Sequence, residues 1–349
     1  MKKFINTILI MLFIVLGILI IIKYDICKNA VLKGIMLCSN VIIPSLFPFT
    51  VCVMFLINSN ALTKIPFLNI LGKPFYLNSE EFTIFLLSTI GGYPIGSKMI
   101  SQLYESGKVT LKKAQIMTCF CINAGPAFII SVVGKSILHN QKIGIILFLS
   151  HIISSFIIAF LLGKNFKEKS KTQIKETFIS PVDNFVLSTS QAARAILNIC
   201  FYIILFTVIT EYSISFSASF PFLRYITFFL EVTIGVSYLR NIYAISFILG
   251  FAGVCIWFQV LSISRKYKLS IIYLIISRIS HGIISMFFTF IFVKLFGIEK
   301  QVFSNDVIFL KIQYFGQISI SISVAILVLF FLLNITSKKY SGNITEDLL

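Results

Sequence analysis

Long apolar runs dominate the chain, and most have the length of a helix that crosses a bilayer. A hydrocarbon core of about 30 Å takes roughly 20 residues of α-helix. Continuous runs of this kind also differ from the alternating pattern of a membrane β-barrel. The sequence therefore predicts an all-α integral membrane protein with about eight transmembrane helices, at 4–22, 38–57, 114–134, 143–163, 195–215, 242–264, 270–293 and 314–334.

Two further apolar pieces, 82–97 and 224–239, are shorter and contain polar or helix-breaking residues. Irregular backbone at membrane depth is tolerated only against protein or a water-filled cavity. We therefore interpret these pieces as re-entrant or broken helices.

The two halves of the chain share a weak internal similarity. Short stretches recur in the same order, among them "TIGGY" and "TIGVS", "CINAGPAF" and "LGFAGVCI", and "LSHIIS" and "ISRISH". Each unit would hold three crossings and one interrupted piece, so the second unit would be upside down relative to the first. Inverted repeats with paired interrupted helices are typical of secondary transporters, whose substrate sites form where the broken helices meet.

These patterns divide the chain into five parts. Lys2 and Lys3 precede an apolar run that resembles a signal peptide, but no small-residue cleavage site ends it, so we expect an uncleaved anchor. The expected parts are the anchor helix 1–29, a first gate-like transmembrane repeat 30–165, a polar cytoplasmic linker 166–190, a second inverted repeat 191–294, and a C-terminal transmembrane helix with its tail 295–349.

The composition agrees with a membrane protein and narrows its partners. The 349 residues are 57% hydrophobic and 12% charged, with 30 Lys and Arg against 13 Asp and Glu. Basic residues collect in cytoplasmic loops, which explains the net charge of +17 and favours a cytoplasmic N-terminus. No basic stripe with interleaved aromatics lies outside the apolar segments, so we expect membrane lipid and no nucleic acid as a partner.

The sequence lacks the usual signatures of enzymes. It contains no G-x-S-x-G, no H-E-x-x-H, no complete P-loop and no G-x-G-x-x-G. Its seven cysteines lie mostly in apolar segments without a framework spacing, which favours small buried hydrophobes over disulfides or metal ligands. We predict no enzymatic activity, no cofactor and no metal.

The stretch "STIGGYPIGSK" breaks an apolar run with three glycines and a proline. Its freed backbone amides could bind an anion or a polar group. The alternative is that the glycines allow close helix packing and that the lysine extends to the interface. The candidate substrate-binding residues here are Gly91, Gly92, Tyr93, Pro94, Gly96, Ser97 and Lys98.

A second interruption, "CINAGPAFIISVVG", holds Asn123, Gly125 and Pro126 inside an apolar span. An Asn side chain is costly in hydrocarbon without a partner, and the proline opens the hydrogen-bond ladder where Asn123 could point inward. The substrate-lining interpretation competes with a simple proline kink in which Asn123 bonds a freed carbonyl.

In the second half, Glu231 and Thr233 lie in the shorter broken piece, and Gln259 follows the pair Ala252–Gly253. His151 and Arg278 occupy corresponding positions in the two repeats. A buried Arg must pair or face water, so Arg278 either neutralises Glu231 or meets an anionic substrate. For His151 a satisfied contact between helices is the alternative.

The blocks "GGYPIGSK" and "CINAGPAFIISVVG", with "IIPSLFPF" before them and "FLEVTIG" after, resemble the sporulation integral membrane proteins of the YlbJ type, also called stage V sporulation protein V. The resemblance covers roughly residues 30–294. It implies a nucleoside-recognition or gate-like domain, similar to halves of concentrative nucleoside carriers. This chain has Ile122 and Ala124 where Asn and Ser are common in the family.

The resemblance also implies a function. Such proteins are implicated in moving dipicolinic acid, a small anionic substrate, from the mother cell across the outer forespore membrane of a spore-forming bacterium. We therefore expect a transporter in that membrane, with a homo-oligomer as a possible assembly. The alternatives are a nucleoside or other small-metabolite carrier of the same fold, and a structural or assembly protein of the spore envelope.

Overall fold

The computed structural model describes residues 2–59, 66–164 and 180–297, and all regular structure within them is helical. The predicted span at 314–334 with its tail, and most of the predicted linker, lie outside the described residues. Residues 181–190 of that linker form the first turns of helix α9 (Pro181–Ser215).

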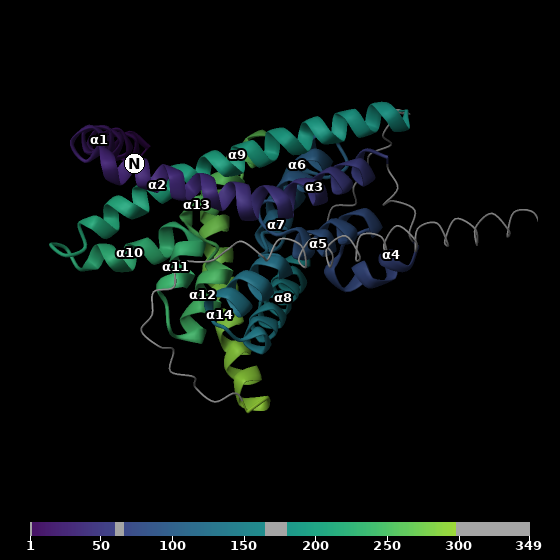
Figure 1. Cartoon of the computed structure of the whole chain (residues 1–349). Helices are drawn as coiled ribbons and strands as arrows, with labels where there is room; N and C mark the ends of the chain where they lie inside the picture. The colour runs from purple at the N-terminus through teal and green to yellow at the C-terminus, as the bar shows by residue number, and fades with distance from the viewer. Residues whose placement is uncertain (1, 60–65, 165–179, 298–349) are drawn as a thin grey trace, which may run out of the picture.

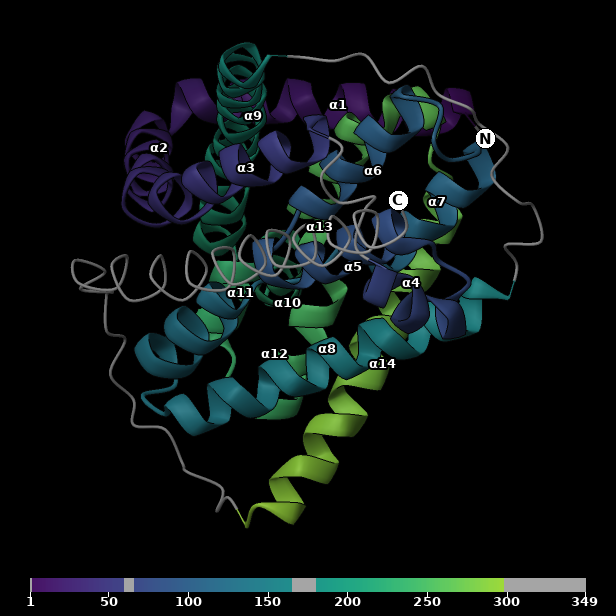
Figure 2. The ribbon, with the colours of Figure 1, turned by 90° about the vertical axis from the view of Figure 1, so that its right-hand side faces the viewer.

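Two long helical runs lie antiparallel and side by side (Figures 1 and 2). The first comprises α2 (Tyr24–Leu37), a π-helical turn (Cys38–Ile42) and α3 (Ile43–Asn58), and the second is α9. The Lys33 ammonium pairs with Glu211 at 2.5 Å near one end of the pair. At the other end, the Asn58 amide donates to the Ser188 hydroxyl at 3.1 Å. The contacts thus extend over almost the full length of both runs.

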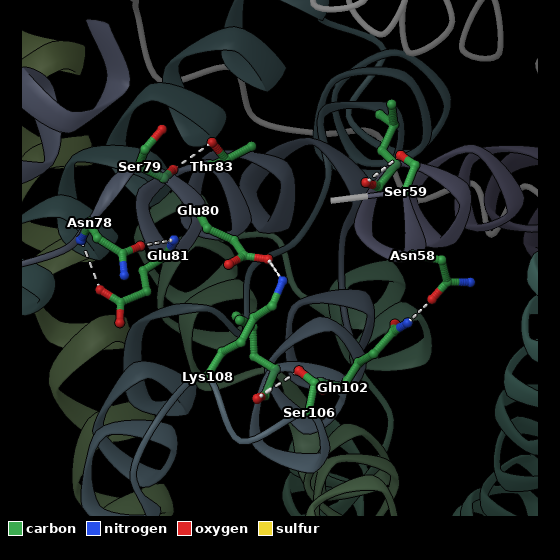
Figure 3. Close-up of polar contacts among 12 residues, drawn as sticks. Asn58, Ser59, Asn78, Ser79, Glu80, Glu81, Thr83, Gln102, Ser106 and Lys108 are labelled. Carbon is green, nitrogen blue, oxygen red and sulfur yellow. Dashed lines mark hydrogen bonds and ion pairs between the residues drawn. The ribbon is translucent and has the colours of Figure 1, made fainter. Parts of the chain in front are cut away.

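The next element is a helical hairpin that packs against α4 (Pro66–Gly72) and the 3₁₀ turn Lys73–Phe75. Its first helix, α5 (Ser79–Gly91), begins with a capping box in which Asn78 and Glu81 bond each other's backbone amides. Its second helix, α6 (Ile95–Glu105), returns to the same end, because Lys108 pairs with Glu80 at 2.6 Å (Figure 3). Helix α5 ends at Gly91, in the interruption that the sequence predicts.

The predicted span 114–134 is not one helix. Instead α7 (Leu111–Phe120) ends before the sequence "CINAGP", and a π-helical segment (Ala127–Ile137, η4) follows. The glycine and proline in this sequence stop the helical ladder, so the segment is broken rather than kinked. Helix α8 (Gln141–Gly163) then follows the predicted span 143–163 closely.

The second half repeats the alternation of helix and break. Helix α10 (Phe222–Leu230) is separated by Glu231 from α11 (Val232–Tyr238). Helix α12 (Ile242–Phe251) is separated by Ala252, in the left-handed conformation, from α13 (Gly253–Ile263). The 3₁₀ turn Ser264–Tyr267 and α14 (Ile271–Leu295) complete the described chain.

Four helices in the described part are long and apolar enough to cross a membrane, at Gln141–Gly163, Pro181–Ser215, Ile242–Tyr267 and Ile271–Leu295. A fifth is obtained if Ile10–Ile22 and Tyr24–Asn40, bent by 103°, count as one span. Eight transmembrane helices are therefore not shown within these residues. Helix α1 (Lys2–Ile22) covers the predicted run 4–22. The predicted runs 38–57 and 114–134 relied on hydrophobic length, which does not register a π turn or a break.

Ion pairs gather where the hairpin, α7 and the turn after α13 meet, a region we call the ionic end: Glu80, Glu81, Glu105, Lys108, Lys113 and Lys266. Besides the pair at Glu80, Lys113 meets Glu81 at 2.7 Å and Lys266 meets Glu105 at 2.7 Å. Burial raises the pKa of the Glu81 carboxyl, and the nearby Lys113 ammonium opposes that rise. These pairs fasten the hairpin to its neighbours.

Candidate functional site

The first two interruptions cross each other in contact. A Cβ built on Gly92 would lie 3.1 Å from the amide nitrogen of Gly125, and one built on Gly96 would lie 1.9 Å from the carbonyl oxygen of Cys121. Gly92 also has a φ of +77°, which glycine adopts readily. The glycines therefore serve the close approach that was the alternative interpretation of this stretch, and this approach brings the two breaks together.

The side chain of Asn123 fastens the second break from inside. Its amide nitrogen donates to the Ser88 hydroxyl at 3.1 Å and to the Phe120 carbonyl at 2.9 Å, while its Oδ1 has no partner among the described residues. The Ser155 hydroxyl of α8 donates to the same carbonyl at 2.8 Å. The local bond to a freed carbonyl thus exists, and an acceptor oxygen remains available beside it.

Arg278 of α14 caps the carboxyl end of α7. Its guanidinium is fully buried and donates to the carbonyl of Ile122 at 2.5 Å and to that of Cys119. The last carbonyls of a helix carry partial negative charge and have no partner within the helix, so a cation there is stabilising. Among the described residues Arg278 forms no ion pair with Glu231, so the predicted neutralisation of that carboxylate is absent.

The side chain of His151 on α8 bonds to the backbone of the same break. Its Nε2 accepts a hydrogen bond from the Ala124 amide at 3.0 Å. Its own carbonyl oxygen lies 3.0 Å from the Nε2 of His281 on α14. His151 is therefore a contact between helices, as its alternative interpretation holds, and one that acts directly on the interrupted segment.

The second pair of interruptions forms a similar contact. The Glu231 carboxylate, 3% exposed, accepts from the Ile234 amide at 2.7 Å and caps the start of α11. The amide and hydroxyl of Thr233 also face this carboxylate. A Cβ on Gly253 would lie 3.1 Å from the Val232 amide nitrogen, so the α12–α13 break touches this cap. Gln259 is buried nearby and donates to the Cys255 sulfur at 3.3 Å.

Tyr93 connects the two pairs of breaks. Its hydroxyl donates to the carbonyl of Leu249 on α12 at 3.5 Å. Ala124 and Val232, one from each pair, belong to a single buried cluster. The predicted residues of the two halves are therefore brought together around one centre. We call the region of Gly91–Ile95, Cys121–Pro126, Glu231 and Ala252–Gly253 the interrupted centre.

Of the remaining predicted residues, Lys98 lies farthest from this centre. Lys98 is half-buried and lies seven residues before Glu105 on α6, on the face that looks toward the ionic end. Pro94 and Pro126 act through the backbone, where they end or begin helices. Ser97, in the first turn of α6, is fully buried.

Several buried polar atoms at the interrupted centre or on the helices that touch it have no hydrogen-bond partner among the described residues. Buried polar atoms are usually satisfied, so such a group of exceptions marks a place that suits a polar ligand. They are Ser97 Oγ, Asn123 Oδ1, Ser150 Oγ, His151 Nδ1, Gln259 Oε1, Arg278 Nε and His281 Nδ1, with Gln102 Oε1 at the far end of α6. Glu81 Oε1 at the far end of α5 has no such partner either, apart from its ion pair with Lys113.

Sequence reasoning missed Ser88, Ser155 and His281. Ser88 is the first residue of "STIGGYPIGSK", but serine side chains bond their own helix so often that the sequence carries no signal for this contact. His281 had a usable signal, because it follows Arg278 by three residues and so lies on the same face of α14. Ser155 has a corresponding relation to His151, four residues earlier on α8.

The helices, the apolar composition and the buried polar centre define the chain as a helical protein of the integral membrane class. It is similar to the sporulation integral membrane protein YlbJ of Bacillus subtilis (strain 168), with 22% identity over an alignment of 321 residues that covers 75% of this chain and 76% of the relative. No family model matches the chain. No solved structure matches it either.

Proposed function

We propose that this protein is a transporter that moves a small anionic molecule, dipicolinic acid, from the mother cell across the outer forespore membrane during sporulation. The similarity to a sporulation integral membrane protein supports the setting. The family resemblance of the glycine and proline blocks supports the substrate. The architecture of the interrupted centre supports the mode of action, which requires no ATP hydrolysis.

The observation that carries the proposal is the meeting of four interrupted helices around partnerless polar atoms. Interrupted backbone inside a membrane is stable only against protein or a polar cavity. Here the breaks at Gly92, Gly125, Glu231 and Gly253 contact one another in pairs. Secondary transporters place their substrate sites at such meeting points.

We further propose that the two halves form an inverted repeat. The hairpin α5–α6 opens toward the ionic end, where Lys108 meets Glu80. The α12–α13 run arrives at that end, where Lys266 meets Glu105, so it starts at the opposite end. Helix α11 directly precedes α12, and therefore the α10–α11 hairpin opens away from the ionic end. The antiparallel pairing of α2–α3 with α9 supports the same relation.

Donor groups at the centre suit an anion. Ser97 Oγ, Ser150 Oγ and Arg278 Nε can each donate a hydrogen bond and have no partner among the described residues. The amino end of α6 adds the positive end of a helix dipole beside Ser97. Arg278 itself is partly balanced by the carbonyls of α7, so its charge both holds the break and adds to a positive potential.

The test is the dipicolinate content of spores from a strain that lacks the protein, complemented at equal expression with wild type, Asn123→Ala or Lys266→Ala. Loss of the Asn123 amide removes about one hydrogen bond's worth of free energy from the centre, roughly tenfold in rate. We expect empty spores in the null strain, full spores with wild type and Lys266→Ala, and strongly reduced filling with Asn123→Ala.

Two other results would replace the proposal. If purified protein in vesicles moves nucleosides, and nucleosides compete with dipicolinate, the protein is a metabolite carrier of the same fold. If Asn123→Ala and Arg278→Lys both insert and restore spores fully, the protein serves a structural or assembly role in the spore envelope. Normal filling of the null strain would remove the dipicolinate assignment.

A further inference from the structure

Two fully buried imidazoles, those of His151 on α8 and His281 on α14, lie with ring centroids 4.3 Å apart and planes inclined by 36°. Helices α8 and α14 pack against each other along this region. His281 follows Arg278 by one turn, and His151 bonds the Ala124 amide of the α7–η4 break. The pair is therefore linked directly to the interrupted centre by this hydrogen bond.

The hydrogen bonds fix which nitrogen carries the hydrogen in each neutral ring. The Ala124 amide can only donate, so the Nε2 of His151 accepts and its Nδ1 carries the hydrogen. The carbonyl of His151 can only accept, so the Nε2 of His281 donates. The Nδ1 of His281 is thus a bare lone pair, and it has no partner among the described residues.

The two rings differ in what a proton would cost them. A proton on Nδ1 of His281 leaves the bond from its Nε2 to the His151 carbonyl intact. A proton on Nε2 of His151 would replace the acceptor of the Ala124 amide by a donor and break that bond. His281 is therefore the member of the pair that gains a proton without losing a contact.

Charged and titratable groups lie near the pair on several of the elements packed around it. Arg278, one turn away on α14, acts on both rings. Cys119 and Cys121 at the end of α7, and Tyr93 in the hairpin, act in turn on Arg278. Glu231 acts on Tyr93, and its carboxylate already caps α11. On α12, Tyr243 packs on Phe290, beyond the pair. A second positive charge beside Arg278 therefore requires a counter-charge from outside the protein.

We propose that His281 binds the proton that travels with the anionic substrate, an inference that rests on the proposed transport function. The anion brings the counter-charge that allows the bare Nδ1 to take a proton, and the protonated ring in turn strengthens binding of the anion. Such coupling is reciprocal by linkage. The proton enters from water on the side where the anion enters and leaves with it, so the cycle is a proton–anion symport.

The experiment uses the full-length protein in proteoliposomes and two assays with labelled dipicolinate. Counterflow exchange requires binding and alternation but no gradient, whereas net accumulation is measured with and without an inward proton gradient. For wild type we expect accumulation that the gradient stimulates. For His281→Gln, which keeps an amide donor for the His151 carbonyl but takes no proton, we expect the ratio of gradient-driven accumulation to exchange to lose its response to the gradient.

The matched control is His139→Gln, at the one remaining histidine of the chain, which lies exposed before α8. It should keep the wild-type ratio. Exchange without any response to the gradient in wild type would overturn the symport and leave transport standing. A gradient response retained by His281→Gln would overturn the assignment of His281.

A second measurement does not require transport. Nitrogen-15 NMR of histidine-labelled protein distinguishes the two tautomers, and we expect one Nδ1–H ring and one Nε2–H ring in the buried pair. Addition of dipicolinate should protonate one ring at mildly acidic pH, and His281→Gln should remove that signal. If wild type moves no dipicolinate in either assay, the proposed function fails, and a histidine that never takes a proton in this titration overturns the inference.

Discussion

At the ionic end, the carboxylates of Glu80 and Glu81 face the ammonium groups of Lys108 and Lys113 at 2.6 and 2.7 Å. At the interrupted centre, neither Arg278 nor Glu231 has an oppositely charged side chain among the described residues. Arg278 faces the carbonyl end of α7, and Glu231 faces the amide end of α11. Side-chain charges are thus matched by side chains at the ionic end and by helix ends at the centre.

The two regions differ in how they can respond to a ligand. An ion pair satisfies both of its members and fixes the elements that carry them. A charged side chain that contacts only the end of a helix is not neutralised by an opposite charge. Polar atoms near these contacts have no partner among the described residues, as at Asn123 Oδ1 and Ser97 Oγ. We therefore infer that the ionic end stabilises the packing of its helices and that the centre binds a ligand. Substitutions in the two regions test this contrast.

The largest effect is expected at the centre, for Arg278→Met. The substitution leaves the buried carbonyls of Cys119 and Ile122 without a donor, and each unsatisfied buried acceptor costs roughly 1–3 kcal/mol. We expect a large fall in the thermal unfolding midpoint in detergent, with Arg278→Lys intermediate because it keeps the charge without the fork. An unchanged midpoint would show that the guanidinium does not hold the break.

The crossing of the breaks is the next target. In Gly96→Ala the new methyl group would lie 1.9 Å from the Cys121 carbonyl oxygen, which is backbone and cannot swing away. We expect a loss of about 3 kcal/mol, at the upper end for overpacking. The matched control is Gly17→Ala, where a Cβ meets nothing within 4 Å. Equal midpoints for the two variants would contradict the described contact.

At the ionic end, Lys113→Ala leaves the buried Glu81 carboxylate without its ammonium partner. We expect a loss of about 2 kcal/mol, below the figure for a fully buried pair because the capping box still bonds Glu81 and the Lys113 side chain is 10% exposed. Burial raises the pKa of Glu81 in the folded state, so the folded state binds the proton more tightly than the unfolded state does.

That sign predicts the pH dependence of the same variant. Its stability should rise as the pH falls from neutral toward the raised pKa of Glu81, and Lys113→Ala with Glu81→Gln should lose this dependence. The measurement is the unfolding midpoint of both variants across mildly acidic to neutral pH. If the midpoint of Lys113→Ala decreased as the pH is lowered, the lysine would not be opposing the burial of this carboxylate.

The smallest effect is expected for Lys266→Ala. Its ion pair with Glu105 is exposed, with side-chain exposures of 62% and 40%, and such pairs contribute at most about 0.5 kcal/mol. The midpoint and the transport rate should both stay within error of wild type. A loss as large as that of Lys113→Ala would mean that the ionic end acts as one network rather than as separate pairs.

The sequence predicted the breaks because their causes are local. Glycine and proline at 91–96 and 125–126 act on their own backbone, so the pattern located both interruptions. The partner of Arg278 was not predictable in this way, since the carbonyl it bonds belongs to a residue 156 positions earlier. The role of His281 depends likewise on its contact with α8, and the order of residues alone does not show that the two helices meet.

The described residues do not show eight spans, and part of the reason is physical. Hydrophobic length treats 38–57 and 114–134 as equal to 143–163, but the first contains a π-helical turn and the second a break. Glu231 was placed correctly in a broken piece, yet its partner is the start of its own helix rather than Arg278. Local signals were thus reliable for where the backbone changes and unreliable for which distant groups meet.

The long antiparallel pair has a consequence for the lipid around it. Helix α9 has 35 residues, about 52 Å at 1.5 Å per residue, which exceeds a hydrocarbon core of about 30 Å. A straight helix of that length must lean or project, and the ion pair of Lys33 with Glu211 ties its partner run to the same inclination. Bilayer thickness therefore acts on both runs together, and lipids of different chain length should change the rate at which the protein works.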